Sequence, residues 1–188
     1  MSLDAATIQA ISVGATVALA FIGYIVTYAN NVRIENRKER LKFISNQLQY
    51  LYGPLYSLSN ASDVAWKTFR SRCRPGGAFF STQPPPSEEE LQQWRLWMTE
   101  VFMPINLKME KAIIENSHLI EGNITPRSFQ EFLAHVEVYK AVIKKWERGD
   151  FSEHTSYLNF PDEMQEEVAS VYSTLKKKQA ILIGASQP

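Results

Sequence analysis

The hydrophobic positions of this chain follow two patterns, a continuous apolar stretch near the amino terminus and a spaced, helix-like pattern after it. No charged side chain occurs between Asp4 and Arg33. A stretch of this length and composition predicts a helix that crosses the roughly 30 Å hydrocarbon core of a bilayer. No basic region precedes it and the helical pattern continues after it, which is not typical of a cleaved signal peptide. We therefore expect residues 1–30 to form a transmembrane anchor.

After this stretch, the apolar residues recur every three or four positions, which is the period of an amphipathic helix. The chain shows no run of alternating apolar and polar residues that would predict a strand. The sequence therefore predicts an all-α fold, a single transmembrane helix that continues into an antiparallel, four-helix-bundle-like domain at residues 31–188. The helices of this domain are expected at about 31–72, 88–120, 126–148 and 161–183, with a Gly-, Pro- and Ser-rich loop at 73–87.

Local signals interrupt or begin these helices. In the stretch LQYLYGPLYSL, Pro54 removes one helical hydrogen bond and Gly53 adds backbone freedom. The leucines on both sides stay in register, so we predict a kinked but continuous helix, with the pair acting as a fixed bend or as a hinge. Pro104 is expected to kink or split the second helix in the same way. Ser87 and Glu90 have the spacing of a capping box at the start of that helix.

The charges that flank the apolar stretch indicate its orientation. Only Asp4 and the amino terminus precede it, whereas a basic cluster follows it, so the positive-inside rule predicts an outside N-terminus and a cytoplasmic domain. The single cysteine, Cys73, cannot form an internal disulfide, which fits a reducing compartment. The basic residues are also expected to contact anionic lipid headgroups. They are Arg33, Arg37, Lys38, Arg40 and Lys42.

The apolar stretch has two distinct faces. Small residues recur every four positions on one face and would let a second helix approach closely, which favours self-association. These residues are Ala6, Ala10, Gly14 and Ala18. A second stripe is polar or small and consists of Gln9, Ser12, Thr16, Ala20, Gly23 and Thr27. Three interpretations stay open: a plain anchor whose hydroxyls bond back to their own helix, a self-associating anchor, or an oligomer whose polar stripe lines a pore.

The sequence contains few candidates for catalysis or metal binding. Twenty basic and twenty acidic residues give zero net charge, which argues against a nucleic-acid-binding protein. Glu115 and His118 form one Glu-x-x-His pair, whereas di-iron bundles use two such pairs and two further glutamates. His135 precedes the predicted core residue Val136 and is expected at the flank of its helix. We therefore expect no metal, no cofactor and no enzymatic activity.

Two charged segments could bind a partner. Arg70, Arg72 and Arg74 lie near a Gly-Gly turn and could hold a small anion, although basic residues at a helix end also complement the helix dipole. The segment 147–167 contains seven acidic residues and only one basic residue. This segment is typical of a solvated face, but it could also bind a basic protein.

Three segments, LYGPLYSL, HVEVYKAVIKKW and NFPDEMQEEVASVYSTLKKKQ, resemble those of a group of uncharacterised bacterial proteins that pair an N-terminal membrane helix with a small helical domain. The resemblance covers most of residues 31–182 and implies this fold and the bacterial inner membrane, but no activity or site residue.

The function that we expect is therefore a membrane-anchored, non-enzymatic interaction or signalling module that self-associates. Its partners would be the membrane, other copies of the chain, and a cytoplasmic protein or a small anionic ligand. The alternative is a homo-oligomeric channel or pore-forming effector, for example in phage defence, whose polar stripe lines a conduit gated by the cytoplasmic bundle.

Overall fold

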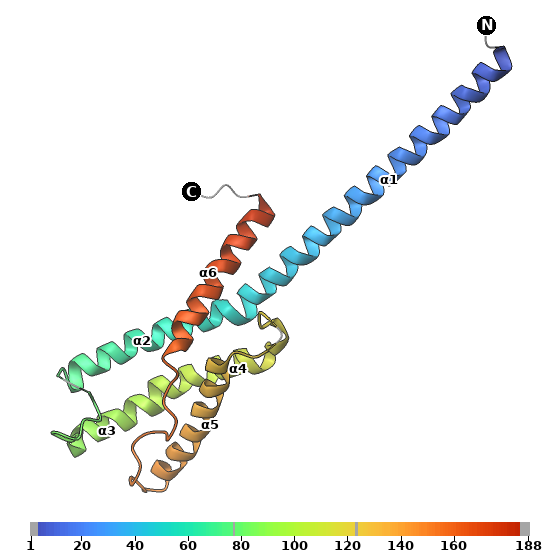
Figure 1. Ribbon diagram of the computed structural model, residues 1–188. Helices are drawn as coiled ribbons and strands as arrows, with labels where there is room; N and C mark the ends of the chain where they lie inside the picture. Colours follow the sequence, from blue (N-terminus) through green and yellow to red (C-terminus); the bar gives the residue numbers. More distant parts are fainter. Residues whose placement is uncertain (1–3, 77, 123, 185–188) are drawn as a thin grey trace. The chain divides into compact units, whose positions relative to one another are not determined.

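Every regular element is a helix in the computed structural model, which describes residues 4–76, 78–122 and 124–184 (Figure 1). The predicted all-α class is therefore confirmed for this part of the chain. Six α-helices are joined by two π-helical turns and one 3-10 turn. In chain order the elements are α1 (Ala5–Asn46), the π-helical η1 (Gln47–Tyr52), α2 (Gly53–Cys73), α3 (Glu88–Trp97), the π-helical η2 (Met98–Phe102), α4 (Met103–Glu115), the 3-10 turn η3 (Ser117–Leu119), α5 (Arg127–Glu147) and α6 (Glu163–Ile183).

The chain divides into two compact units, Met1–Phe43 and Ile44–Pro188. Unit 1 contains most of α1, and its described side chains up to residue 40 are all exposed. Unit 2 contains the remaining helices and the hydrophobic core. Residues 31–43, which we expected to begin the first helix of the packed domain, belong to unit 1, because their side chains find few packing partners there.

The helices of unit 2 form a closed series of neighbours. α2 packs against α4 and α6, α4 packs against α5, and α5 packs against α6. One side of each helix is buried, and its buried residues are spaced three and four positions apart, as the sequence predicts. Each fully buried aliphatic or aromatic side chain stabilises the folded state by about 1.5–3 kcal/mol. The most deeply buried core residues are Leu51, Leu55, Phe69, Met109, Phe129, Phe132, Val136, Met164 and Val168.

The first two long segments of unit 2 run antiparallel to each other. At one end Arg74 pairs with Glu90 across 3.4 Å, and at the other end Gln47 Nε2 donates to the Leu119 carbonyl at 2.9 Å. Gln47 is only 3% exposed, so this bond satisfies a buried amide that would otherwise be costly. The two ends of the helical pair are therefore fixed by polar contacts, and apolar side chains fill the space between them.

Both predicted proline interruptions take the same form, a π-helical turn directly before the helix that contains the proline. The Gly53 N–H donates to the Leu48 carbonyl, five residues back, and the Met103 N–H donates to the Met98 carbonyl in the same way. The residue that follows each donor is a proline. A π turn widens the helix locally, which makes room for the proline ring and changes which carbonyls lack a donor.

Gly53 fits this turn because it has no side chain. A Cβ atom built at Gly53 would lie 2.2 Å from the Leu48 carbonyl oxygen, far closer than any ordinary contact. The tyrosines beside it hold the turn in place. Tyr52 is 2% exposed, and the Tyr56 ring stacks on Tyr172 of α6 with centroids 4.5 Å apart and planes 3° from parallel.

Candidate functional site

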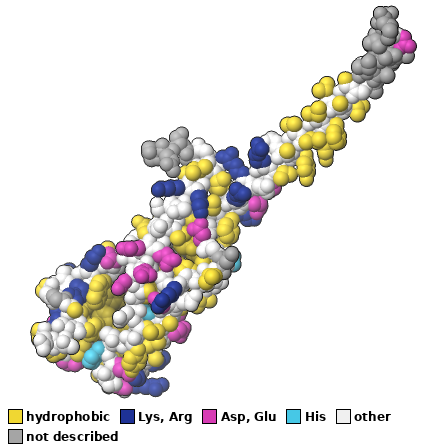
Figure 2. Space-filling view, viewed as in Figure 1, with side chains coloured by type: hydrophobic (Ala, Val, Ile, Leu, Met, Phe, Trp, Pro, Cys, Tyr) yellow, Lys and Arg dark blue, Asp and Glu magenta, His cyan; other side chains and the backbone are white. Residues whose placement is uncertain are grey.

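The most extensive exposed apolar surface of the described chain lies on α1. Its large side chains between Val17 and Tyr28 are 49–69% exposed, the extremes being Ile25 and Leu19. Within the described residues, one helical run, Gly14–Cys73, is long and apolar enough to cross a membrane, and none of its most apolar part is buried. Figure 2 shows these hydrophobic side chains along α1. An apolar surface of this extent marks a site for lipid or for another protein.

Two hydroxyls of the polar stripe of α1 donate to carbonyls of their own helix. The Ser12 hydroxyl donates to the Gln9 carbonyl at 2.8 Å, and the Thr16 hydroxyl donates to the Ser12 carbonyl at 2.9 Å. Gly23 and Thr27 of the same stripe are exposed. The hydroxyls of Ser12 and Thr16 therefore need neither water nor a second helix as a partner, as in the plain-anchor interpretation.

The small-residue ladder is described only in part. The side chains of Ala6 and Ala10 lie outside the described residues. Gly14 and Ala18 are exposed, and a Cβ atom at Gly14 would meet no atom within 4 Å. The surface at this point is open to a close neighbour of the kind that small residues allow.

The basic residues that follow the apolar stretch are all exposed, as headgroup contact would require. Lys38 pairs with Glu35 at 3.5 Å, and both side chains are more than 60% exposed. Such an exposed pair contributes little stability, so Glu35 does little to hold Lys38 in place. The members of the cluster are Arg33, Arg37, Lys38, Arg40 and Lys42.

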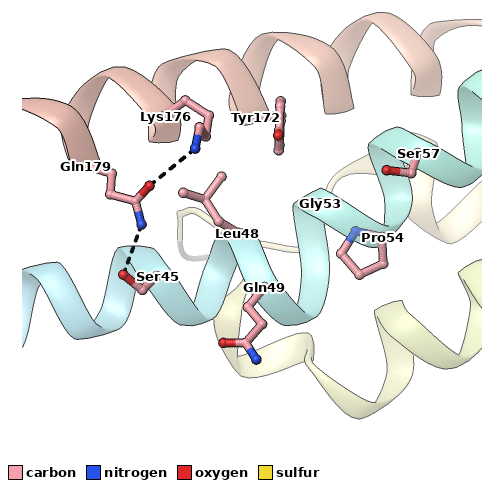
Figure 3. Close-up of a pocket in the computed structure, with 9 residues that line it drawn as sticks. All are labelled: Ser45, Leu48, Gln49, Gly53, Pro54, Ser57, Tyr172, Lys176 and Gln179. Atoms are coloured by element: carbon pink, nitrogen blue, oxygen red, sulfur yellow. Dashed lines mark hydrogen bonds between the residues drawn. The ribbon is translucent and has the colours of Figure 1, made fainter.

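A groove of about 460 Å³ lies between α6 and the chain on both sides of the first π turn (Figure 3). Gln179 of α6 donates to the Ser45 hydroxyl at 3.1 Å and accepts from Lys176 at 3.5 Å. These polar groups bond to one another across the groove, so their main effect is to tie α6 to the chain next to the π turn. The groove is lined by Ser45, Leu48, Gln49, Gly53, Pro54, Ser57, Tyr172, Lys176 and Gln179.

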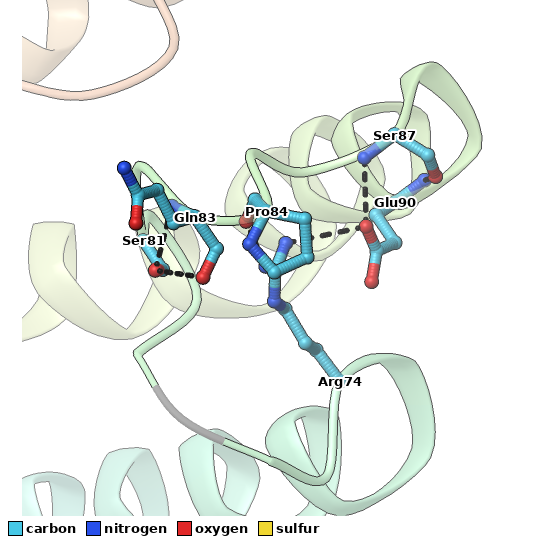
Figure 4. Close-up of polar contacts among 6 residues, drawn as sticks. All are labelled: Arg74, Ser81, Gln83, Pro84, Ser87 and Glu90. Atoms are coloured by element: carbon cyan, nitrogen blue, oxygen red, sulfur yellow. Dashed lines mark hydrogen bonds and ion pairs between the residues drawn. The ribbon is translucent and has the colours of Figure 1, made fainter.

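Two of the three arginines at the end of α2, where a small anion site is expected, contact other groups of this chain. Arg74 pairs with Glu90 and also donates to the Pro84 carbonyl (Figure 4). The Arg70 guanidinium lies 5.6 Å from the centre of the Trp66 ring. Arg72 is exposed. Arg70 and Arg74 therefore have structural contacts, which lie at the end of α2 and in the loop that follows it.

The loop beside Arg74 is anchored at its far end by the predicted capping box. The Ser87 hydroxyl accepts from the Glu90 N–H at 3.2 Å, and the Glu90 carboxylate accepts from the Ser87 N–H at 2.7 Å, which confirms the prediction. Glu90 thus serves both the cap and the ion pair with Arg74 (Figure 4). At the start of the loop, burial raises the pKa of the Cys73 thiol, which lowers its reactivity at neutral pH.

An aromatic cluster lies where α2, α3 and this loop meet. Phe69 is fully buried at its centre, with ring centroids of Phe79 at 5.0 Å, Trp97 at 5.5 Å and Trp94 at 5.6 Å. Figure 2 shows hydrophobic side chains in a hollow over this part of the surface. The sequence placed the tryptophans on apolar seams, but it did not predict that Phe79, from a Gly- and Pro-rich loop, would be 2% exposed.

The acidic segment after α5 is an ordered covering of the helical core. Two buried indoles donate to its backbone, Trp146 to the Glu153 carbonyl and Trp94 to the His154 carbonyl, each at 2.7 Å. The Glu153 carboxylate also accepts from Lys145 at 2.6 Å. The Glu153 carboxylate is therefore paired within the domain, so fewer acidic groups of this segment could pair with a basic protein.

The expectation that His135 lies at a helix flank is wrong, because the same segment covers it. His135 is 6% exposed, and its Nδ1 lies 2.6 Å from the Leu158 carbonyl. The rings of Tyr139 and Phe160 pack around it, at 5.2 and 5.8 Å between centroids. Burial lowers the pKa of the imidazole, so it is neutral at pH 7 and acts as a core residue.

We find no match to this chain among known protein families, curated proteins or solved structures. Within the described residues, no group of three or more His, Cys, Asp and Glu side chains is placed to hold a metal ion. The features that remain as candidates for function are the exposed apolar helix, its basic flank and the junction between η1 and α6.

Proposed function

We propose that this chain is a membrane-anchored, non-enzymatic helical interaction module of the bacterial inner membrane. The observation that carries the proposal is the exposure of all the large apolar side chains between Val17 and Tyr28, around every side of α1. A soluble helix buries one apolar stripe against its neighbours, whereas a helix that is apolar all round is covered by lipid. The length of the stretch matches the thickness of a bilayer.

Two further observations support a span, and the second of them also supports an N-terminus outside. The rings of Tyr24 and Tyr28 lie near the end of the apolar stretch, with centroids 6.4 Å apart, at the depth where amphipathic rings favour the membrane interface. The exposed basic cluster begins five residues later, at Arg33, on the side that the positive-inside rule assigns to the cytoplasm.

In this proposal, unit 2 is a four-helix-bundle-like cytoplasmic domain. The closed series of contacts from α2 to α4, α5, α6 and back to α2 supports the arrangement. A binding module is proposed in preference to an enzyme because the sequence contains no recognisable catalytic motif.

The anchor is tested by substituting two valines that have the same exposure. Val17 in the middle of the apolar stretch and Val64 on α2 are both 63% exposed. Lysine at the centre of a transmembrane helix costs about 3 kcal/mol, so Val17→Lys should lower the inserted-to-extracted ratio about a hundredfold, measured by extraction of membranes with alkaline carbonate. Val64→Lys is the matched control and should leave insertion unchanged. Equal extraction of both variants and the wild type would contradict the proposal.

Self-association is proposed through the open surface at Gly14 and Ala18. The replacements Gly14→Leu and Ala18→Leu should dissociate the oligomer, measured as native mass in detergent, because bulky residues keep the helix backbones apart. An unchanged mass would rule out this face as the interface. If the oligomer also conducts ions in liposomes and Thr16→Leu abolishes the flux, the channel alternative replaces the module.

A further inference from the structure

The last turns of α6 carry apolar side chains that the core of unit 2 does not bury. α6 packs into the domain through Met164, Val168 and Leu175, each at most 1% exposed. The helix continues beyond Leu175 to Ile183, and Ile181 and Ile183 are 66% and 59% exposed. Burial inside the domain therefore does not explain this apolar end.

Three consecutive lysines, Lys176, Lys177 and Lys178, precede these isoleucines. Lys178 pairs with Glu121 at 2.6 Å, and Lys176 contacts the neutral amide of Gln179 at 3.5 Å. No acidic partner is found for Lys176 or Lys177 within the described part of the chain. Lysines near a helix C-terminus also complement the helix dipole, but the dipole does not account for exposed isoleucines. Cationic and exposed apolar side chains together are typical of a helix that rests on anionic lipid.

The direction of α6 places this end where the chain enters unit 2. Tyr172 stacks on Tyr56 at 4.5 Å, and seven residues later Gln179 bonds to Ser45 at 3.1 Å (Figure 3). α6 therefore runs antiparallel to the segment from Ser45 to Tyr56, and Ile183 lies beyond the contact with Ser45. In the proposed function, the basic cluster that contacts headgroups ends at Lys42, only three residues before Ser45, so the contact with Ser45 keeps the end of α6 close along the chain to the lipid-facing segment.

We propose that the C-terminal end of α6, with Lys176, Lys177, Ile181 and Ile183, is a second membrane-contact site that binds the headgroups of anionic phospholipids. This inference rests on the proposed membrane anchor. The proposed contact would hold unit 2 against the bilayer, and the position of unit 2 would then depend on the charge of the lipid headgroups. Each well-placed cation adds about a 5-fold preference for an anionic surface, so the two lysines without an acidic partner together favour the docked state about 30-fold.

The test uses the full chain in lipid nanodiscs, with Cys73→Ala to remove the native thiol. A fluorophore is attached to Ile183→Cys and, as a matched aliphatic control, to Val64→Cys, which is 63% exposed and lies beyond the opposite end of α6. The discs contain phosphatidylcholine alone or mixed with phosphatidylglycerol, and a trace of lipid with a headgroup spin label quenches nearby fluorophores. Incorporation of the chain into discs is measured separately on the same samples.

We expect the label at Ile183 to be quenched in discs that contain phosphatidylglycerol and much less in neutral discs, while the label at Val64 is unaffected. Replacing Lys176 and Lys177 by Gln should lower the docked-to-undocked ratio about 30-fold. Equal quenching at positions 183 and 64 would overturn the inference, and so would quenching that does not change with the lysine replacements or with the lipid charge. Neither result would contradict the proposed membrane anchor. Failure of the chain to incorporate into any disc overturns the proposed function, and the inference falls with it.

Discussion

The replacement Gly53→Ala distinguishes the π-helical turn from an ordinary helix, because the two predict opposite changes in stability. In a regular helix, alanine is more stable than glycine by about 1 kcal/mol. In this turn the new Cβ would lie 2.2 Å from the Leu48 carbonyl oxygen, so the backbone must shift. The shift weakens the hydrogen bond from Gly53 to Leu48, worth about 1 kcal/mol, and disturbs packing at a typical cost of about 1–3 kcal/mol.

The expected net result is a loss of about 1–3 kcal/mol in the free energy of unfolding, after the gain in helix propensity is subtracted. The assay is urea unfolding of the full chain in detergent, followed by tryptophan fluorescence. Gly76→Ala is the matched control, because a Cβ atom there meets nothing within 4 Å, and it should change the midpoint little. A stabilised Gly53→Ala protein would refute the reasoning and would show that the helix is regular at this position.

Three further predictions concern the core of unit 2. Phe69→Ala should destabilise the fold by about 3–5 kcal/mol in the same urea assay, because Phe69 is fully buried among aromatic rings, whereas a loss below about 1 kcal/mol would mean that the cluster is loosely packed. Because burial lowers the pKa of His135 from 6.5, the unfolded chain binds a proton at this residue more tightly than the folded chain does. The contribution of His135 to the free energy of unfolding should therefore be fully present above about pH 6.5 and be lost as the pH falls towards the lowered pKa. His135→Asn should remove this contribution from the pH profile of unfolding. Glu110 is 8% exposed, and its carboxylate lies 2.9 Å from Lys140. Lys140→Met should destabilise the fold more than Glu110→Gln, because it leaves this buried carboxylate without its partner. Equal losses of stability in the urea assay would contradict this asymmetry.

The helices could be predicted because their signals are local. The spacing of apolar residues selects a helix over a strand, and the Ser87–Glu90 cap depends on residues only three positions apart. The prolines also showed where each long helix is interrupted. They did not show that the chain forms a π turn instead of a plain kink, because the choice between hydrogen bonds four or five residues apart depends on the surrounding packing.

The environments of particular side chains could not be predicted, because they depend on contacts between distant segments. His135 is buried by residues more than twenty positions away, and Phe79 is drawn into the core from a loop by Phe69 and Trp94. The ion pair between Arg74 and Glu90 could not be predicted either, because the two residues lie at the ends of different helices. The apolar helix and its basic flank were visible in the sequence because they are continuous stretches of composition and do not depend on contacts with distant segments.

The central claim, a single span with the N-terminus outside, is tested most directly by labelling engineered cysteines in intact cells. With Cys73→Ala as the background, Asp4→Cys and Glu39→Cys place one thiol on each side of the apolar stretch. A membrane-impermeant maleimide should label the thiol at position 4 in intact cells, and should label the thiol at position 39 only after the cells are permeabilised. Labelling of both thiols in intact cells, or of position 39 alone, would contradict the proposed topology.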